Sequence, residues 1–168
     1  MYDTSTYPHD IRRTNPNYVR AAAVSLGLLA DQLPRAVAAG QGEAVSDAID
    51  AALGRITWEL TCLTDDLVTS FNGKGGNLPM HATAIRQCAA PLGLATHYLA
   101  KAIDQISSHH QFFAPATATQ TEPPKDLLPA LQRDIEHARN AIYATATQYS
   151  TNASLLGSNP TTSTHTPK

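Results

Sequence analysis

Histidine and acidic side chains are the residues of this chain that could hold a metal ion. A di-iron or di-manganese helical protein uses a Glu-x-x-His pair on each of two helices, together with further inward glutamates. The nearest match is Asp134, three residues before His137, whereas Glu43 and Glu59 have no histidine three residues on. A zinc site that combines a histidine of the pair at 109–110 with His137 stays open as an alternative. We expect no cofactor and no bound metal.

A second chemical candidate is the segment RDIEH, in which Arg133 precedes His137 by four residues. This spacing resembles the Arg-to-His motif of the HEPN ribonucleases, an all-helical family. The resemblance covers this one short motif, and it departs from the family pattern because three residues intervene where the family has four or more. It implies a ribonuclease with Arg133 and His137 as the catalytic pair. The alternative is that both belong to a solvated helix face.

The chain has two cysteines, Cys62 and Cys88, which form no CxxC pair and adjoin no histidine. Neither zinc ligation nor thiol catalysis is therefore indicated. If the chain turns a corner at Gly75, the two cysteines are equally far from the corner and lie level on two antiparallel helices. We expect two buried thiols that behave as small hydrophobic groups, with a redox-formed disulfide between them as the alternative.

Trp58 is the strongest candidate for an interaction residue. It is two residues from Ile56, which places it roughly 200° round a helix from the apolar face, at about 100° per residue. It shares its side with Ala51 and Cys62. Tryptophan is enriched among the residues that dominate binding energy, so an exposed Trp58 would anchor a protein partner. The alternative is a helix buried on two sides within its own fold.

Composition and charge narrow the possible partners. A length of 168 residues fits one domain, and a net charge of −2 gives no general attraction to phosphate backbones. Nucleic acid is therefore not expected as the partner. A nucleic-acid accessory protein, the third function class, would need the arginines at 12–13, Arg20 and Arg35 on one exposed surface.

The sequence also bears on location. The longest apolar-rich run covers residues 21–30, and a membrane-spanning helix needs about 20 residues. The first residues have no apolar core of the kind that a secretion signal requires. We therefore expect a cytoplasmic protein with no membrane contact, and the Arg- and Ala-rich, Lys-poor usage fits a bacterial source.

Four segments repeat apolar residues at intervals of three and four, which predicts amphipathic helices. The first starts with Asn15 as its cap and Pro16 in its first turn, and it should end near Pro34. The second, at 43–72, has the most regular stripe, which runs from Val45 to Phe71.

The third helix is expected from Leu78 to about Phe113, bent near Pro91, and the fourth from 124–126 to Tyr149. The glycine-rich segment before Leu78 lacks the strand and the hydroxyl residue of a phosphate-binding loop, so it is read as a corner.

Together these features predict an all-α four-helix bundle in which the second and third helices form an antiparallel hairpin. Residues 1–14 are expected to be a flexible leader, 15–156 one domain, and 157–168 a disordered tail. The expected function is non-enzymatic: an accessory, regulatory or scaffolding module that contacts an unknown protein partner, with a homodimer also possible. The ribonuclease, the metal-binding enzyme and the nucleic-acid accessory protein are the alternatives.

Overall fold

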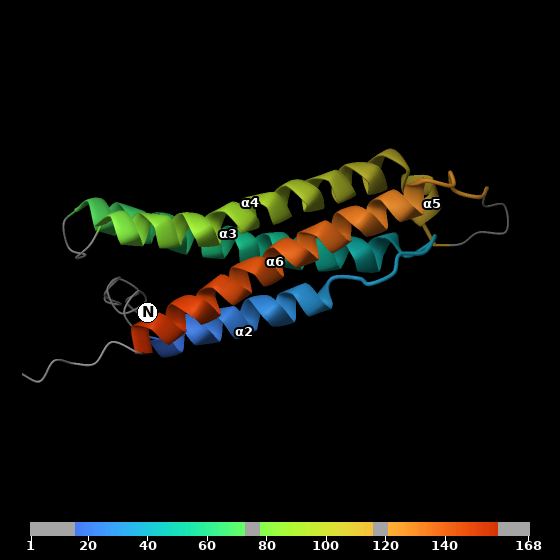
Figure 1. Ribbon diagram of the computed structural model, residues 1–168. Coiled ribbons are helices and arrows are strands. Elements are labelled where there is room, and N and C mark those ends of the chain that lie inside the picture. Colours follow the sequence, from blue (N-terminus) through green and yellow to red (C-terminus); the bar gives the residue numbers. More distant parts are fainter. Residues whose placement is uncertain (1–15, 73–77, 116–120, 158–168) are drawn as a thin grey trace, which may run out of the picture.

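The computed structural model describes residues 16–72, 78–115 and 121–157, and within these ranges the chain is helical and has no strand. The leader, residues 158–168 of the predicted tail, the cap at Asn15 and the glycine-rich corner lie outside the described residues, whereas Gly157, predicted as the first residue of the tail, is the last residue of a helix. The helices are α2 (Pro16–Gln32), α3 (Gly42–Phe71), α4 (Leu78–Ser108), α5 (His110–Phe113) and α6 (Leu127–Gly157), as Figure 1 shows.

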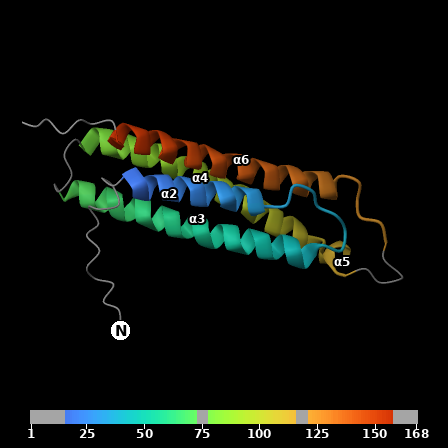
Figure 2. The same ribbon diagram turned by 90° about the horizontal axis from the view of Figure 1, so that it is seen from below.

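The four long helices run side by side, and the short α5 lies at one end of them (Figures 1 and 2). α6 packs along both α4 and α2, whereas α3 packs mainly along α4 and meets α2 over a short stretch. α3 is thus the least enclosed of the long helices. None of the helices in the described ranges is long and apolar enough to cross a membrane.

Apolar side chains spaced by helical turns form the core, as the sequence predicts. Each long helix contributes at least one side chain with no exposed surface, for example Leu26, Ile49, Leu99 and Ile142. Burial of a Leu or Ile side chain stabilises a fold by about 1.5–3 kcal/mol, so these contacts hold the helices together. One member of the predicted α3 stripe is wrong: Phe71 is 70% exposed, because the last turn of a helix has fewer neighbours than its middle.

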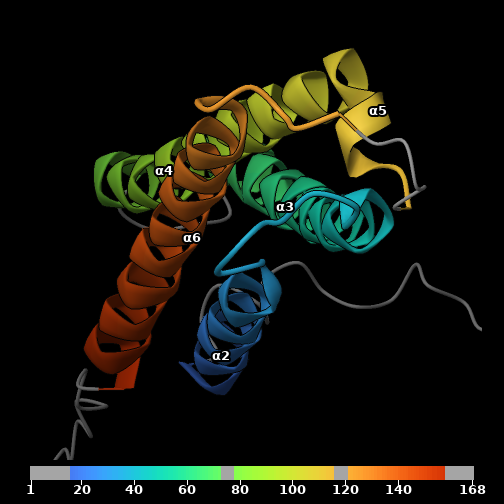
Figure 3. The same ribbon diagram turned by 90° about the vertical axis from the view of Figure 1, so that its right-hand side faces the viewer.

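The predicted single helix from Leu78 to Phe113 is also wrong, because it divides into α4 and α5. His109, between the two, has a φ of −125° and a ψ of 30°, which is not helical. The break lets α5 fold back beside the start of α3 (Figure 3). There the amide of Gly40, just before α3, donates to the carbonyl of Phe112 at 2.9 Å. This contact buries Phe113. Because the predicted third helix is two helices, the described residues hold five helices instead of the predicted four.

Two prolines carry predictions, an end of the first helix at Pro34 and a bend at Pro91, and the bend stays a prediction. α2 ends at Gln32, just before Pro34, as the sequence predicts. Pro91 lies inside α4, which continues through it although the ring removes one backbone N–H. Beside this gap, the buried Thr145 hydroxyl of α6 donates to the carbonyl oxygen of Cys88 at 3.2 Å. α6 thus supplies a hydrogen bond where α4 is weakened.

The close approach of α5 to α3 gives a test of this arrangement. A Cβ added at Gly42 would lie 2.7 Å from the Cβ of Phe113, whereas one added at Gly27 would meet nothing within 4 Å. We expect Gly42→Ala to lower the free energy of unfolding by about 1–3 kcal/mol through overpacking. Gly27→Ala should raise it by up to about 1 kcal/mol, because alanine is the better helix former. Urea unfolding of both variants measures the difference, and equal stability of the two would contradict the position of α5.

Candidate functional site

Trp58 lies in the middle of α3 and is 49% exposed. The helix turns the side chain away from the buried face, as the offset from Ile56 predicts. Its role as an interaction anchor stays a prediction. The structure therefore places the only tryptophan of the chain on the surface of its least enclosed helix.

A continuous row of exposed residues passes through Trp58, and we call it the outer stripe of α3. Its members follow one another at intervals of three and four residues, so they line one side of the helix. They are Asp47, Ala51, Gly54, Trp58, Thr61, Asp65 and Val68, and every one is exposed. The row gathers one large aromatic, two carboxylates and several small side chains on a single outward face.

The small residues of the outer stripe leave space beside the indole. A Cβ added at Gly54 would meet nothing within 4 Å. Helical side chains lean toward the N-terminus of their helix, so we expect the Trp58 ring to lean toward Gly54 and Ala51. The half-exposed indole thus adjoins a stretch of α3 that has only small side chains, which suits contact with another helix.

The charge on this side of α3 is negative. Glu43, Asp47, Asp50 and Asp65 are all exposed, and no ion pair with them is found among the described residues. Arg55 is the only basic residue of α3, and it is bound to Glu59. The outer stripe therefore presents carboxylates that form no ion pair within the described part of the chain, around an aromatic side chain.

The inner side of α3 holds a carboxylate, Glu59, whose burial was not predicted from the sequence. Glu59 is 3% exposed; its Oε1 accepts from Arg55 Nη2 at 2.6 Å, and its Oε2 accepts from the Tyr149 hydroxyl at 3.2 Å. A signal existed, because Glu59 continues the spacing of Ile56 and Leu63. The hydrogen bond between Tyr149 and Glu59 joins α3 to α6 across the core.

Burial and the charge of Glu59 change the pKa values of two neighbouring groups, the Cys88 thiol and the Tyr149 hydroxyl. Desolvation and the charge of Glu59 raise the pKa of the Cys88 thiol to about 12. The same two causes raise the pKa of the Tyr149 hydroxyl. Cys88 is buried, Cys62 is half-buried, and the structure places no disulfide between them. The Cys88 thiol and the Tyr149 hydroxyl therefore stay protonated at neutral pH. The disulfide between Cys62 and Cys88 stays a prediction.

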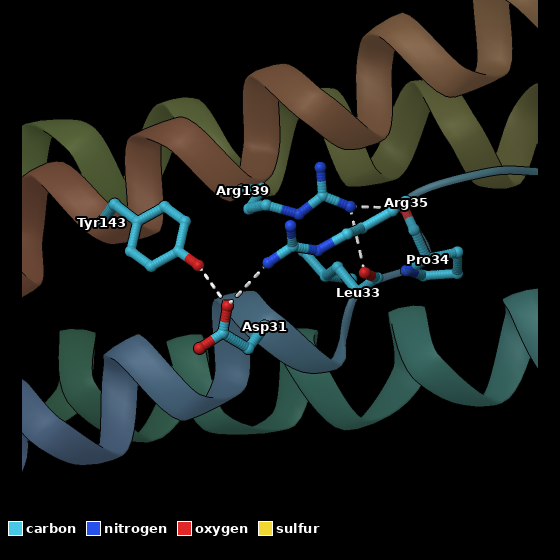
Figure 4. Close-up of polar contacts among 6 residues, drawn as sticks. All are labelled: Asp31, Leu33, Pro34, Arg35, Arg139 and Tyr143. Atoms are coloured by element: carbon cyan, nitrogen blue, oxygen red, sulfur yellow. Dashed lines mark hydrogen bonds and ion pairs between the residues drawn. The ribbon is translucent and has the colours of Figure 1, made fainter.

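A second group of polar contacts, drawn in Figure 4, joins the C-terminal end of α2 to α6. The guanidinium of Arg139, on α6, points to the chain after α2 and donates to the carbonyl oxygen of Leu33 at 3.0 Å and to that of Pro34. Asp31 accepts from the Tyr143 hydroxyl and from Arg35 Nη2, the latter at 3.2 Å.

The Arg139 contacts satisfy two carbonyls of the chain that follows α2, and a cation beside the C-terminal end of a helix also complements the helix dipole. Arg139 is buried although it is charged, so its bonds serve to attach α2 to α6. No local sequence signal indicates this role, since more than 100 residues separate Arg139 from its acceptors.

The predicted ribonuclease pair lies on an exposed part of α6. Arg133 and His137 are both exposed, and the His137 ring packs against Tyr98 of α4 with centroids 4.7 Å apart. Between them, Asp134 is buried and accepts from Lys101 Nζ at 3.1 Å and from Gln105 Nε2 at 2.7 Å. Asp134 is therefore engaged in joining α4 to α6.

The other candidate sites do not come together. Within the described ranges, no group of three or more His, Cys, Asp or Glu side chains is placed to hold a metal ion. An open hollow of about 360 Å³ lies at the start of α3, and neither Arg133 nor His137 lines it. Its lining residues are Gly40, Gln41, Glu43, Ala44 and Asp47. Arg20 bonds Asn17 at 3.3 Å, and the arginines at 12–13 lie outside the described residues.

Comparisons with protein-family models, with characterised proteins and with solved structures gave no match to this chain.

The burial of Cys88 predicts that its thiol reacts much more slowly with an alkylating reagent than the thiol of Cys62. At about pH 8 a rise of the pKa from 9.0 to about 12 leaves roughly a thousandfold less thiolate, the form that reacts. We expect iodoacetamide to label Cys62 well before Cys88 in the folded protein, and both at similar rates in denaturant. Mass spectrometry over time measures this order. Equal rates in the folded protein would contradict the burial, and two thiols that react only after reduction would demonstrate the disulfide.

The same shift predicts how stability depends on pH. Because the folded state holds the Cys88 proton more tightly, its contribution is intact below about pH 9 and is lost as the pH rises toward about 12. Urea unfolding at increasing pH should therefore show falling stability above about pH 9, with a smaller fall in Cys88→Ala.

Proposed function

We propose that this chain is a non-enzymatic helical protein that acts through protein–protein contacts, as an accessory, regulatory or scaffolding module. The proposal includes two finer points of architecture, namely that the four long helices act as a bundle and that α3 and α4 form an antiparallel hairpin. It also places the protein in the cytoplasm, on the sequence grounds given above. The partner is a protein, and its surface meets the outer stripe of α3.

The observation that carries the proposal is the exposure of Trp58. A tryptophan buries up to about 250 Å² when it is covered, and half of this one faces solvent. Tryptophan is among the most frequent residues at the energetic centre of protein interfaces. An exposed indole in the middle of a poorly covered helix is therefore well suited to receive a partner.

The state of the buried polar side chains also supports a binding function. Glu59, Asp134 and Arg139 are all buried, and each forms hydrogen bonds to groups of the same chain. Each of these bonds joins two helices or attaches the end of one helix to another. Both carboxylates and the Nη2 atom of Arg139 are engaged in the fold, whereas the buried Nε of Arg139 has no hydrogen-bond partner among the described residues.

Trp58→Ala tests the proposal, with Leu94→Ala as the matched control because Leu94 on α4 has the same 49% exposure. The tagged full chain is expressed in its native host, and co-purified proteins are identified and quantified. We expect Trp58→Ala to reduce recovery of a specific partner roughly tenfold or more, as loss of about 2 kcal/mol at a hot spot implies.

Leu94→Ala should leave recovery unchanged, and both variants should unfold within about 0.5 kcal/mol of the parent, as surface substitutions usually do. Equal recovery with Trp58→Ala and the parent chain would refute Trp58 as the anchor.

A further inference from the structure

We infer that the outer stripe of α3 binds a basic, amphipathic helix of a partner protein. This inference rests on the proposed function and adds the chemistry of the partner. It follows from the shape of the stripe, from its charge, and from the way its charges would meet in a self-association.

The shape of the outer stripe fits a helix lying along it. From Asp47 to Val68 the stripe extends about 30 Å, at about 1.5 Å per residue, which matches a helix of about 20 residues. Gly54 and Ala51 allow a second backbone to approach α3 closely. Trp58 then stands as the apolar side chain that an opposing helix can cover with its own apolar face.

The charge of the outer stripe selects a basic occupant. Asp47 lies at one end of the stripe, Asp65 lies one position before the other end, and Asp50 flanks it, all three exposed. Lys or Arg side chains at both ends of a docked helix would each find a carboxylate. Opposite charges across an interface speed association and favour the correct partner over others.

The same charges disfavour a second copy of the chain as the occupant. If two α3 helices paired antiparallel about the midpoint between Gly54 and Trp58, each Trp58 would cover the Gly54 of the other copy. However, Asp47 of each copy would then face Asp65 of the other. A parallel pairing would place every carboxylate opposite itself. Both arrangements bring like charges together, which is destabilising.

The test uses the full chain and a synthetic peptide of about 20 residues that contains leucine at helical spacing and lysine elsewhere. Because Trp58 is the only tryptophan, its fluorescence reports binding directly. We expect a saturable blue shift of the emission on addition of this tryptophan-free peptide. The affinity should fall as salt screens the charges, and a peptide with glutamate in place of lysine should give no shift.

Two glycine variants make the test specific to the outer stripe. Gly54→Leu fills the low surface beside Trp58, whereas Gly93→Leu does the same on the exposed side of α4, and a Cβ at either position meets nothing within 4 Å. We expect Gly54→Leu to weaken peptide binding at least tenfold and Gly93→Leu to leave it unchanged. A triple variant, Asp47→Asn with Asp50→Asn and Asp65→Asn, should bind more weakly and with less dependence on salt.

Three outcomes would overturn the inference. They are the absence of a shift with the lysine peptide, equal binding by Gly54→Leu and the parent chain, and a homodimer in analytical ultracentrifugation that Gly54→Leu dissociates. The first two leave the proposed function standing if Trp58→Ala still loses its partner from the host. An unchanged partner recovery with Trp58→Ala refutes the proposed function by itself, so the two failures are distinguishable.

Discussion

A carboxylate buried among helices is the constraint on which the position of α3 depends. An ionised glutamate taken out of water must find hydrogen-bond donors, or its burial destabilises the fold by several kcal/mol. Glu59 finds one in Arg55, on its own helix, and one in Tyr149 of α6. Since α3 otherwise packs mainly along α4, the hydrogen bond to Tyr149 fixes the rotation and axial position of α3 against α6.

The rotation of α3 about its axis determines both which of its residues are buried and which are exposed. With Glu59 turned inward, Trp58 lies one residue earlier and about 100° round the helix, on a side that faces solvent, and it is 49% exposed. The interior polar contacts and the outward aromatic thus belong to one arrangement. Two buried side chains of α6 likewise form hydrogen bonds to other parts of the fold: Arg139 to the chain after α2, and Asp134 to α4.

The helical fold could be predicted from the sequence because turn-by-turn spacing of apolar residues is a local property, and so could the outward direction of Trp58. The separation of α5 could not, because it depends on the fit of Phe113 against Gly42, far away in the chain. Glu59 lies on an apolar stripe, but a carboxylate is assigned to solvent unless its partners are known. The role of Arg139 likewise depends on contacts that only the folded chain brings together.

A double-mutant cycle between Glu59 and Tyr149 tests the central claim most directly. The free energy of unfolding is measured by urea denaturation for the parent chain, Glu59→Gln, Tyr149→Phe and the double variant. A hydrogen bond to a charged group in a buried site predicts a coupling energy of about 1–3 kcal/mol between the two positions. A coupling energy of zero, with both single effects additive, would contradict the account that this bond sets the position of α3.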